Sequence, residues 1–224
     1  MKTEIGSSKS KRHPSYGDLA LDDLKKIFHL TITRPLLFEQ IIPLEPSQWL
    51  RDVLKAGFAM SVVSEKARSE FLVAPILLCI QERHQGQISI YSGVKFDVEP
   101  ERGLRGVCDF ILSASPMLPT VQSPVFVMVE AKKNDIEEGL GQCVGEMIAA
   151  QLFNQREQRA LPSIYGCVTT GENWQFLRLR ETLLEIDAQR FFLVNVPDIL
   201  GILEAIVRES LAAANLLDES SPIR

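Results

Sequence analysis

The stretch PVFVMVEAKK, residues 124–133, decides the fold of this chain. Its unbroken apolar run from Val125 to Val129 is typical of a strand that is covered on both faces. Side chains two residues apart on a strand point to the same face, so Glu130 and Lys132 are expected to project together while Ala131 turns the other way. Charges at the end of a buried strand are costly unless they meet solvent, a metal ion or a substrate. The stretch therefore predicts a central strand with a candidate site at its carboxyl end.

A second apolar stretch, GVCDFIL at residues 106–112, carries a single acid, Asp109. An Asp on one strand and a Glu-x-Lys on the adjacent strand can assemble a divalent-metal site beside an ammonium group. Each element alone has an ordinary alternative, because Glu-x-Lys also occurs where charges solubilise an exposed strand end. The order of the surrounding elements therefore decides between the two interpretations.

Asp109 followed by Glu130-Ala131-Lys132 resembles the PD-(D/E)XK nuclease superfamily, which has the restriction endonuclease-like fold. The resemblance covers about residues 60–180. It includes an acidic helix at residues 64–71, Gln142 in the helix that follows the Glu-x-Lys strand, and a strand–turn–strand segment ending in Trp-x-Phe at residues 174–176. One departure is Cys108, which stands where a Pro often precedes the Asp. The resemblance implies a three-layer α/β/α core with a mixed central sheet, preceded here by an N-terminal helical extension.

The resemblance also implies roles for individual residues. Asp109, Glu130 and the backbone carbonyl of Ala131 would bind Mg²⁺, for which Mn²⁺ can substitute. Lys132 would orient or deprotonate the attacking water or stabilise the phosphate, and Gln142 would hold a water or a phosphate oxygen. The expected function is Mg-dependent hydrolysis of phosphodiester bonds, most of all in DNA. The alternatives are an inactive nuclease-fold protein that serves binding or assembly, and an enzyme that uses Glu130 and Lys132 as an acid–base pair on a small molecule.

Two further acids have open assignments. Glu65 and Glu70 lie about 140° apart around a helix, so they are not expected to serve one metal ion together. We favour Glu70 as the catalytic acid because it precedes Phe71 on the apolar stripe, whereas Glu65 suits the first turn of a helix. Glu146 lies one turn beyond Gln142 on the same face, as a solvated or structural neighbour or as a group that supports the site.

Composition limits the remaining classes. The chain has 224 residues, of which 46% are hydrophobic, and its net charge of −5 argues against a broad basic surface for nucleic acid. No apolar run is long enough to cross a bilayer, and the basic N-terminus has no apolar region typical of a signal peptide. The four cysteines and three histidines are scattered, which favours a reduced, cytoplasmic protein without structural zinc.

The expected organisation is a disordered tail at 1–17, a helical extension at 18–60 that covers the core or makes a homodimer contact, a nuclease core at 61–215 and a tail at 216–224. Periodicity and turn residues predict helices and strands along the whole chain. The helices are at 18–30, 46–60, 64–84 with a kink or break at Pro75, 136–158 and 196–213; the strands are at 87–98, 104–113, 124–133, 163–170, 174–180 and 182–187. The first two strands are expected to form a hairpin, and the helix at 136–158 to connect two parallel strands.

Overall fold

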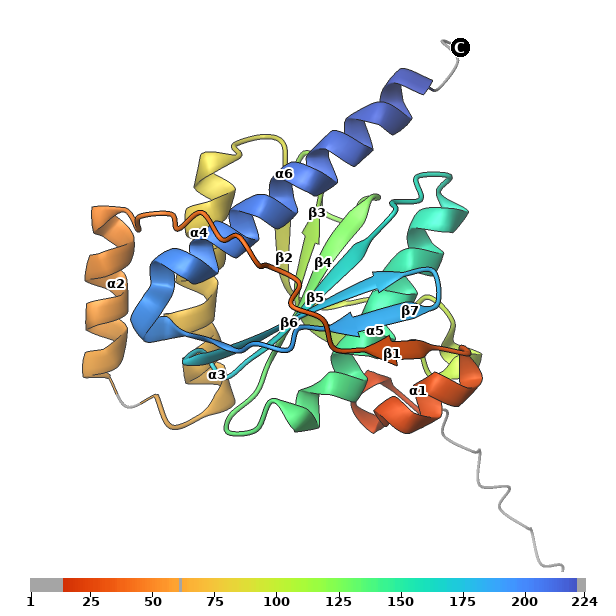
Figure 1. Cartoon of the computed structure of the whole chain (residues 1–224), viewed down its shortest axis with the longest axis horizontal. Coiled ribbons are helices and arrows are strands. Elements are labelled where there is room, and N and C mark those ends of the chain that lie inside the picture. Colours follow the sequence, from red (N-terminus) through yellow and green to blue (C-terminus); the bar gives the residue numbers. More distant parts are fainter. Residues whose placement is uncertain (1–13, 61, 221–224) are drawn as a thin grey trace, which may run out of the picture.

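The computed structural model describes residues 14–60 and 62–220 and contains an eight-stranded mixed sheet between two layers of helices (Figure 1). The strands follow the order β1-β7-β6-β5-β4-β3-β2, and β8 pairs with β6. This arrangement confirms the predicted α/β class with a mixed central sheet and helices on both faces.

The strands are β1 (Thr31–Thr33), β2 (Ser89–Lys95), β3 (Val107–Ser113), β4 (Val125–Ala131), β5 (Ile164–Thr169), β6 (Asn173–Arg180), β7 (Leu183–Ile186) and β8 (Phe191–Phe192). The helices are α1 (Leu21–Ile27), α2 (Gln48–Ala59), α3 (Glu65–Arg68), α4 (Ala74–Arg83), α5 (Glu137–Arg156) and α6 (Val196–Ser220).

Strand β4 is the centre of the fold, and each of its residues is buried. One face of the sheet packs against α2, α4 and α6, and the other packs against α1 and α5 (Figure 1). Strands β2 and β3 form the predicted antiparallel hairpin, and α5 connects β4 to its parallel neighbour β5. The predictions for the strand at 124–133 and for both pairings are therefore confirmed. Trp174 and Phe176 belong to the core, as their spacing on one face predicts.

The helix predicted at 64–84 begins at an N-cap, where Ser64 Oγ accepts from the Ala67 N–H at 3.1 Å. Between α3 and α4 the chain forms a π-helical turn over Ser69–Val73, directly before Pro75. Proline has no N–H and clashes with the carbonyl four residues earlier, and a wider turn relieves that clash. The predicted break at Pro75 is thus present as a change of helix type.

Both predicted tails are shorter than expected in the described part of the chain. Tyr16 is 1% exposed, and its hydroxyl donates to the Phe96 carbonyl at 2.7 Å, whereas residues 1–13 lie outside the described residues. Leu19 then packs on α5 so closely that a Cβ on Gly141 would lie 2.1 Å from its carbonyl oxygen. At the other end, α6 continues to Ser220, and Arg159 pairs with Asp218 at 2.5 Å. The N-terminal segment also adds β1 to the sheet beside β7.

We expect Tyr16→Phe to reduce the free energy of unfolding by about 1–2 kcal/mol, because it leaves the buried Phe96 carbonyl without its donor. Urea unfolding measures the change. Tyr91→Phe is a matched control, since its hydroxyl donates to Thr120 at a partly buried position and its loss should cost less. Equal stability of Tyr16→Phe and the wild type would contradict the anchoring role of Tyr16.

Candidate active site

The site begins where β3 and β4 part. The backbone pairing of the two strands ends at Phe110 and Val129. Asp109 comes one residue before Phe110 on β3, and its Oδ2 accepts from the Ala131 N–H at 2.8 Å. A side-chain carboxylate thus takes the place of a strand-to-strand hydrogen bond. This contact holds Asp109 beside Glu130, the penultimate residue of β4.

Glu130, which is 1% exposed, has a partner on each carboxylate oxygen. Lys132 Nζ donates to its Oε1 at 2.5 Å, and Gln142 Nε2 donates to its Oε2 at 2.8 Å. Lys132 Nζ also donates to Gln142 Oε1 at 3.2 Å, and Gln142 Nε2 donates to Glu146 Oε1 at 3.3 Å. We call these five residues, Asp109, Glu130, Lys132, Gln142 and Glu146, the β4-end cluster.

Helix α5 brings Gln142 to this cluster because it lies very close to the sheet. At Gly139 an added Cβ would meet Val168 Cγ1 at 2.5 Å and the Lys132 side chain at 3.1 Å. Only glycine allows that approach, and Gln142 follows less than one turn later on α5. The structure therefore brings together four residues that the sequence singles out: Asp109, Glu130, Lys132 and Gln142.

Burial dominates the electrostatics of the cluster. It raises the pKa of Glu130 to about 8, helped by the charge of Asp109 and opposed by Lys132. Burial also raises the pKa of Asp109, although the Ala131 N–H opposes this. For Lys132, burial would lower the pKa, but the charge and hydrogen bond of Glu130 outweigh it and raise the pKa. Lys132 therefore keeps its proton while the two carboxyl groups resist being charged together.

The structure does not bring Glu70 into the cluster. Glu70 is exposed and lies 3.7 Å from Lys66 Nζ, whereas the charge of Glu65 raises the pKa values of Asp109, Glu130 and Lys132. The preference for Glu70 rested on its place next to Phe71, but consecutive helical residues point about 100° apart. Glu65 is thus the helix acid whose charge acts on this site.

Glu146 is 0% exposed, so the interpretation of it as a solvated neighbour of Gln142 is wrong. Burial and the charge of Glu130 raise its pKa well above the ordinary value, with partial opposition from Gln142 and Cys108. The helical spacing from Gln142 is the signal that places it near the site. Its burial follows from packing against the sheet, which the spacing does not reveal.

The carboxylate oxygens of Asp109 and Glu130 are of the type that hard cations prefer as ligands. Within residues 14–60 and 62–220, no group of three or more His, Cys, Asp or Glu side chains is arranged to hold a metal ion. Mg²⁺ needs only one or two carboxylates, however, because it keeps several of its waters. The charge of Asp109 raises the pKa of Glu130, and a bound cation would offset that effect.

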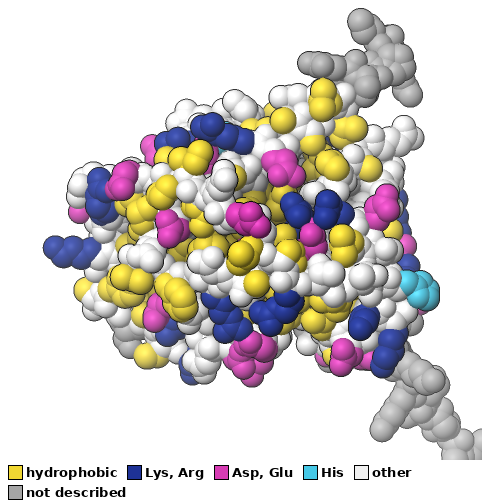
Figure 2. Space-filling view, in the orientation of Figure 1, with side chains coloured by type: hydrophobic (Ala, Val, Ile, Leu, Met, Phe, Trp, Pro, Cys, Tyr) yellow, Lys and Arg dark blue, Asp and Glu magenta, His cyan; other side chains and the backbone are white. Residues whose placement is uncertain are grey.

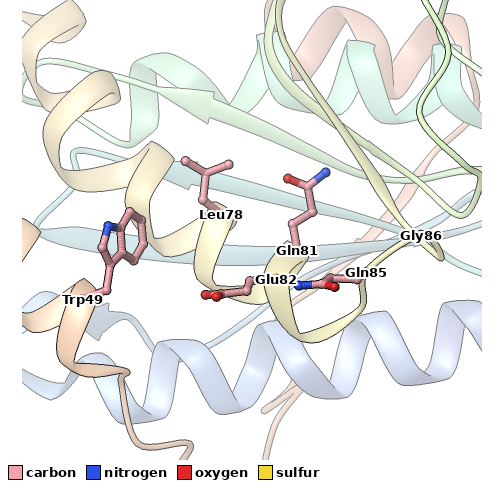
Figure 3. Close-up of a pocket in the computed structure, with 6 residues that line it drawn as sticks. All are labelled: Trp49, Leu78, Gln81, Glu82, Gln85 and Gly86. Atoms are coloured by element: carbon pink, nitrogen blue, oxygen red, sulfur yellow. The ribbon is translucent and has the colours of Figure 1, made fainter.

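A hollow on the surface lies apart from the cluster and shares no lining residue with it. The hollow in Figure 3, of about 480 Å³, lies between α2, α4 and the following turn, and is lined by Trp49, Leu78, Gln81, Glu82, Gln85 and Gly86. Access to the cluster is instead through the partly exposed side chains of Asp109, Lys132 and Gln142. On the face shown in Figure 2, basic, acidic and hydrophobic side chains are intermixed without a continuous basic tract.

No family model matches the chain, and no curated protein matches it closely. Within the part of the chain that the structure describes, no helix combines the length and the apolar character needed to cross a membrane. Function is therefore inferred from the geometry of the site.

Proposed function

We propose that this chain is a magnesium-dependent nuclease of the PD-(D/E)XK type, with a restriction endonuclease-like fold, that hydrolyses phosphodiester bonds in DNA. The observation that carries the proposal is the β4-end cluster. Two carboxyl groups from neighbouring strands lie beside a protonated lysine and an amide, at the carboxyl end of a buried strand.

Asp109, Glu130 and the Ala131 carbonyl would hold the Mg²⁺, and Mn²⁺ would substitute for it. The cation would polarise the phosphate and lower the pKa of a bound water. The Asp109 side chain is already fixed on the Ala131 N–H, so the two carboxyl groups are positioned before any ligand binds. The Glu65 carboxylate adds negative charge near the same point.

Lys132 has a different task, because a protonated amine has no lone pair to offer a metal ion. Its ammonium group orients the attacking water or meets the charge that develops on the phosphate. Gln142 accepts from Lys132 Nζ and donates to Glu130, so it holds both groups in place. The protein's own side chains thus position the carboxyl groups, stabilise developing negative charge and orient the reacting groups.

A nuclease assay tests the proposal directly. With Mg²⁺ or Mn²⁺, the wild type should cleave plasmid or single-stranded DNA, and EDTA should stop the reaction. A parallel reaction with RNA shows whether the protein cleaves DNA in preference to RNA. Asp109→Asn keeps an acceptor for the Ala131 N–H and serves as the matched inactive control. Cleavage that is equal in Asp109→Asn and the wild type would remove the site from the mechanism.

A second candidate is a nuclease-fold protein without catalysis that serves binding or assembly. It is favoured by the partners that already occupy both oxygens of Glu130, which is the pattern of a structural ion pair. In that case DNA binding or complex formation persists without cleavage under any metal. The same assay, with binding measured in parallel, separates the two functions.

We further propose a homodimer in the cytoplasm. A dimer would present two clusters to the two strands of a duplex, and light scattering tests it. The cytoplasmic assignment is supported by Cys79, Cys108, Cys143 and Cys167, which are all buried and free, as expected in a reducing compartment.

A further inference from the structure

Glu146 is the one member of the β4-end cluster to which the proposed reaction gives no task. It lies on α5, one turn beyond Gln142, and is 0% exposed. Its Oε1 accepts from Gln142 Nε2 at 3.3 Å. Its Oε2 is buried and makes no hydrogen bond within the described residues, although the Cys108 thiol lies close enough to lower the pKa of the carboxyl group.

Stability does not account for a carboxyl group at this position. Burying a carboxyl group with one oxygen unpaired costs free energy, whether the group is charged or neutral. An apolar side chain of similar length, such as Met, would fill the same space among the apolar residues of α5 without that cost. A residue that the fold would be more stable without is a candidate for a functional role.

The contacts of Gln142 show what that role can be. A glutamine amide has one oxygen and one NH₂ group, and rotation by half a turn exchanges them. Glu130 Oε2 and Glu146 Oε1 both accept from the Nε2 group, so together they fix the NH₂ on their side. The amide oxygen then faces Lys132 Nζ. Without Glu146 one of the two acceptors is lost, and the amide is held by Glu130 and Lys132 alone, so it turns more readily.

We propose that Glu146 is a positioning residue: with Glu130 and Lys132 it holds the Gln142 amide in one orientation, in which the oxygen faces Lys132 and the NH₂ group faces Glu130. Its consequence for hydrolysis rests on the proposed nuclease function, but the orientation itself does not. Glu146 acts only through Gln142 and touches no substrate.

Two substitutions of similar size separate positioning from packing. Glu146→Gln keeps an acceptor oxygen for Gln142, and Glu146→Met removes it. The Met variant should be at least as stable as the wild type in urea, yet its kcat should fall on the order of tenfold to a hundredfold with little change in KM. The Gln variant should retain most of the activity. Met147→Leu, a buried change at the next residue of α5, controls for repacking of the helix.

A second readout does not depend on nuclease activity. The side-chain NH₂ of Gln142 can be assigned by nuclear magnetic resonance from its loss in Gln142→Met. Its exchange with water should be slow in the wild type and in Glu146→Gln, and on the order of tenfold faster in Glu146→Met. If Glu146→Met does not fold, Glu146→Leu provides the same comparison.

Unchanged exchange of the Gln142 NH₂ in the apolar variants overturns the proposal, whatever happens to hydrolysis. Faster exchange in a protein that cleaves no nucleic acid supports the positioning role while refuting the nuclease function. Equal loss of kcat in Met147→Leu and Glu146→Met would assign the effect to packing and also overturn the proposal.

Discussion

Asp109→Asn is expected to stabilise the metal-free protein above neutral pH and to reduce hydrolysis on the order of a hundredfold to a thousandfold. Hydrolysis falls because the variant removes one of the two proposed carboxylate ligands. Stability rises because burial holds the pKa of the Asp109 carboxyl above its usual value. An acid whose pKa is raised in the folded state stabilises the fold below its unfolded pKa, about 4. This contribution is lost as the pH rises through the folded pKa. The gain in the variant should therefore be larger at pH 8 than at pH 5.

Thermal unfolding in EDTA at these two pH values, with hydrolysis rates in Mg²⁺, checks this prediction. Asp97→Asn is the matched control, because Asp97 also accepts from a backbone N–H, that of Gly106, at 3.0 Å. Burial alone would raise the pKa of Asp97, but Lys95 and the Gly106 N–H outweigh it and lower the pKa. Asp97 therefore stabilises the fold above about pH 4, and its replacement should cost stability at pH 8. Similar losses in both variants, with unchanged hydrolysis, would contradict the assignment of Asp109.

Lys132→Met is expected to destabilise the metal-free protein by up to about 3 kcal/mol and to slow hydrolysis on the order of a hundredfold or more. The ion pair with Glu130 is buried, with side-chain exposures of 15% and 2%. Removal of the ammonium leaves the carboxyl group of Glu130 in the core without a counter-charge. The loss of stability should grow as the pH rises, because at low pH the Glu130 carboxyl group is protonated and carries no unpaired charge. Metal affinity should persist, because Lys132 is not a ligand.

The double variant Lys132→Met/Glu130→Gln should recover much of the lost stability, which urea unfolding of the four proteins in the cycle would measure. Lys95→Met serves as the exposed control, since Lys95 pairs with Asp97 at 69% exposure and such a pair contributes about 0–1 kcal/mol. If Lys132→Met is as stable as Lys95→Met and hydrolyses at the wild-type rate, Lys132 is an ordinary surface charge.

Local patterns predicted the central part of the fold. The apolar run ending in Glu-x-Lys identified β4 and its terminal charges, and alternation with turn residues identified the β2–β3 hairpin. Helical periodicity predicted the helix that follows β4, and the resemblance to the PD-(D/E)XK superfamily singled out Gln142 in that helix. These features depend on neighbours in sequence, which is why the sequence shows them.

The remaining features depend on contacts between distant segments. Tyr16 is anchored by a carbonyl eighty residues away in sequence, and the three-residue strand β1 exists only because β7 lies beside it. The choice between Glu65 and Glu70 depends on how α3 faces β3 and β4, which no helical pattern records. Glu146 is buried because α5 approaches the sheet closely at Gly139, a packing effect that becomes visible only in the assembled fold.

Calorimetric titration of Mn²⁺ into the wild type and Asp109→Asn at pH 7.5 tests most directly whether the β4-end cluster is a cation-dependent site. We expect saturable binding to the wild type with one ion per chain, accompanied by proton release because the Glu130 carboxyl must ionise. We expect Asp109→Asn to lose this binding while remaining folded. Absence of saturable binding to the wild type, or equal affinity in the two proteins, would contradict the proposed cation site.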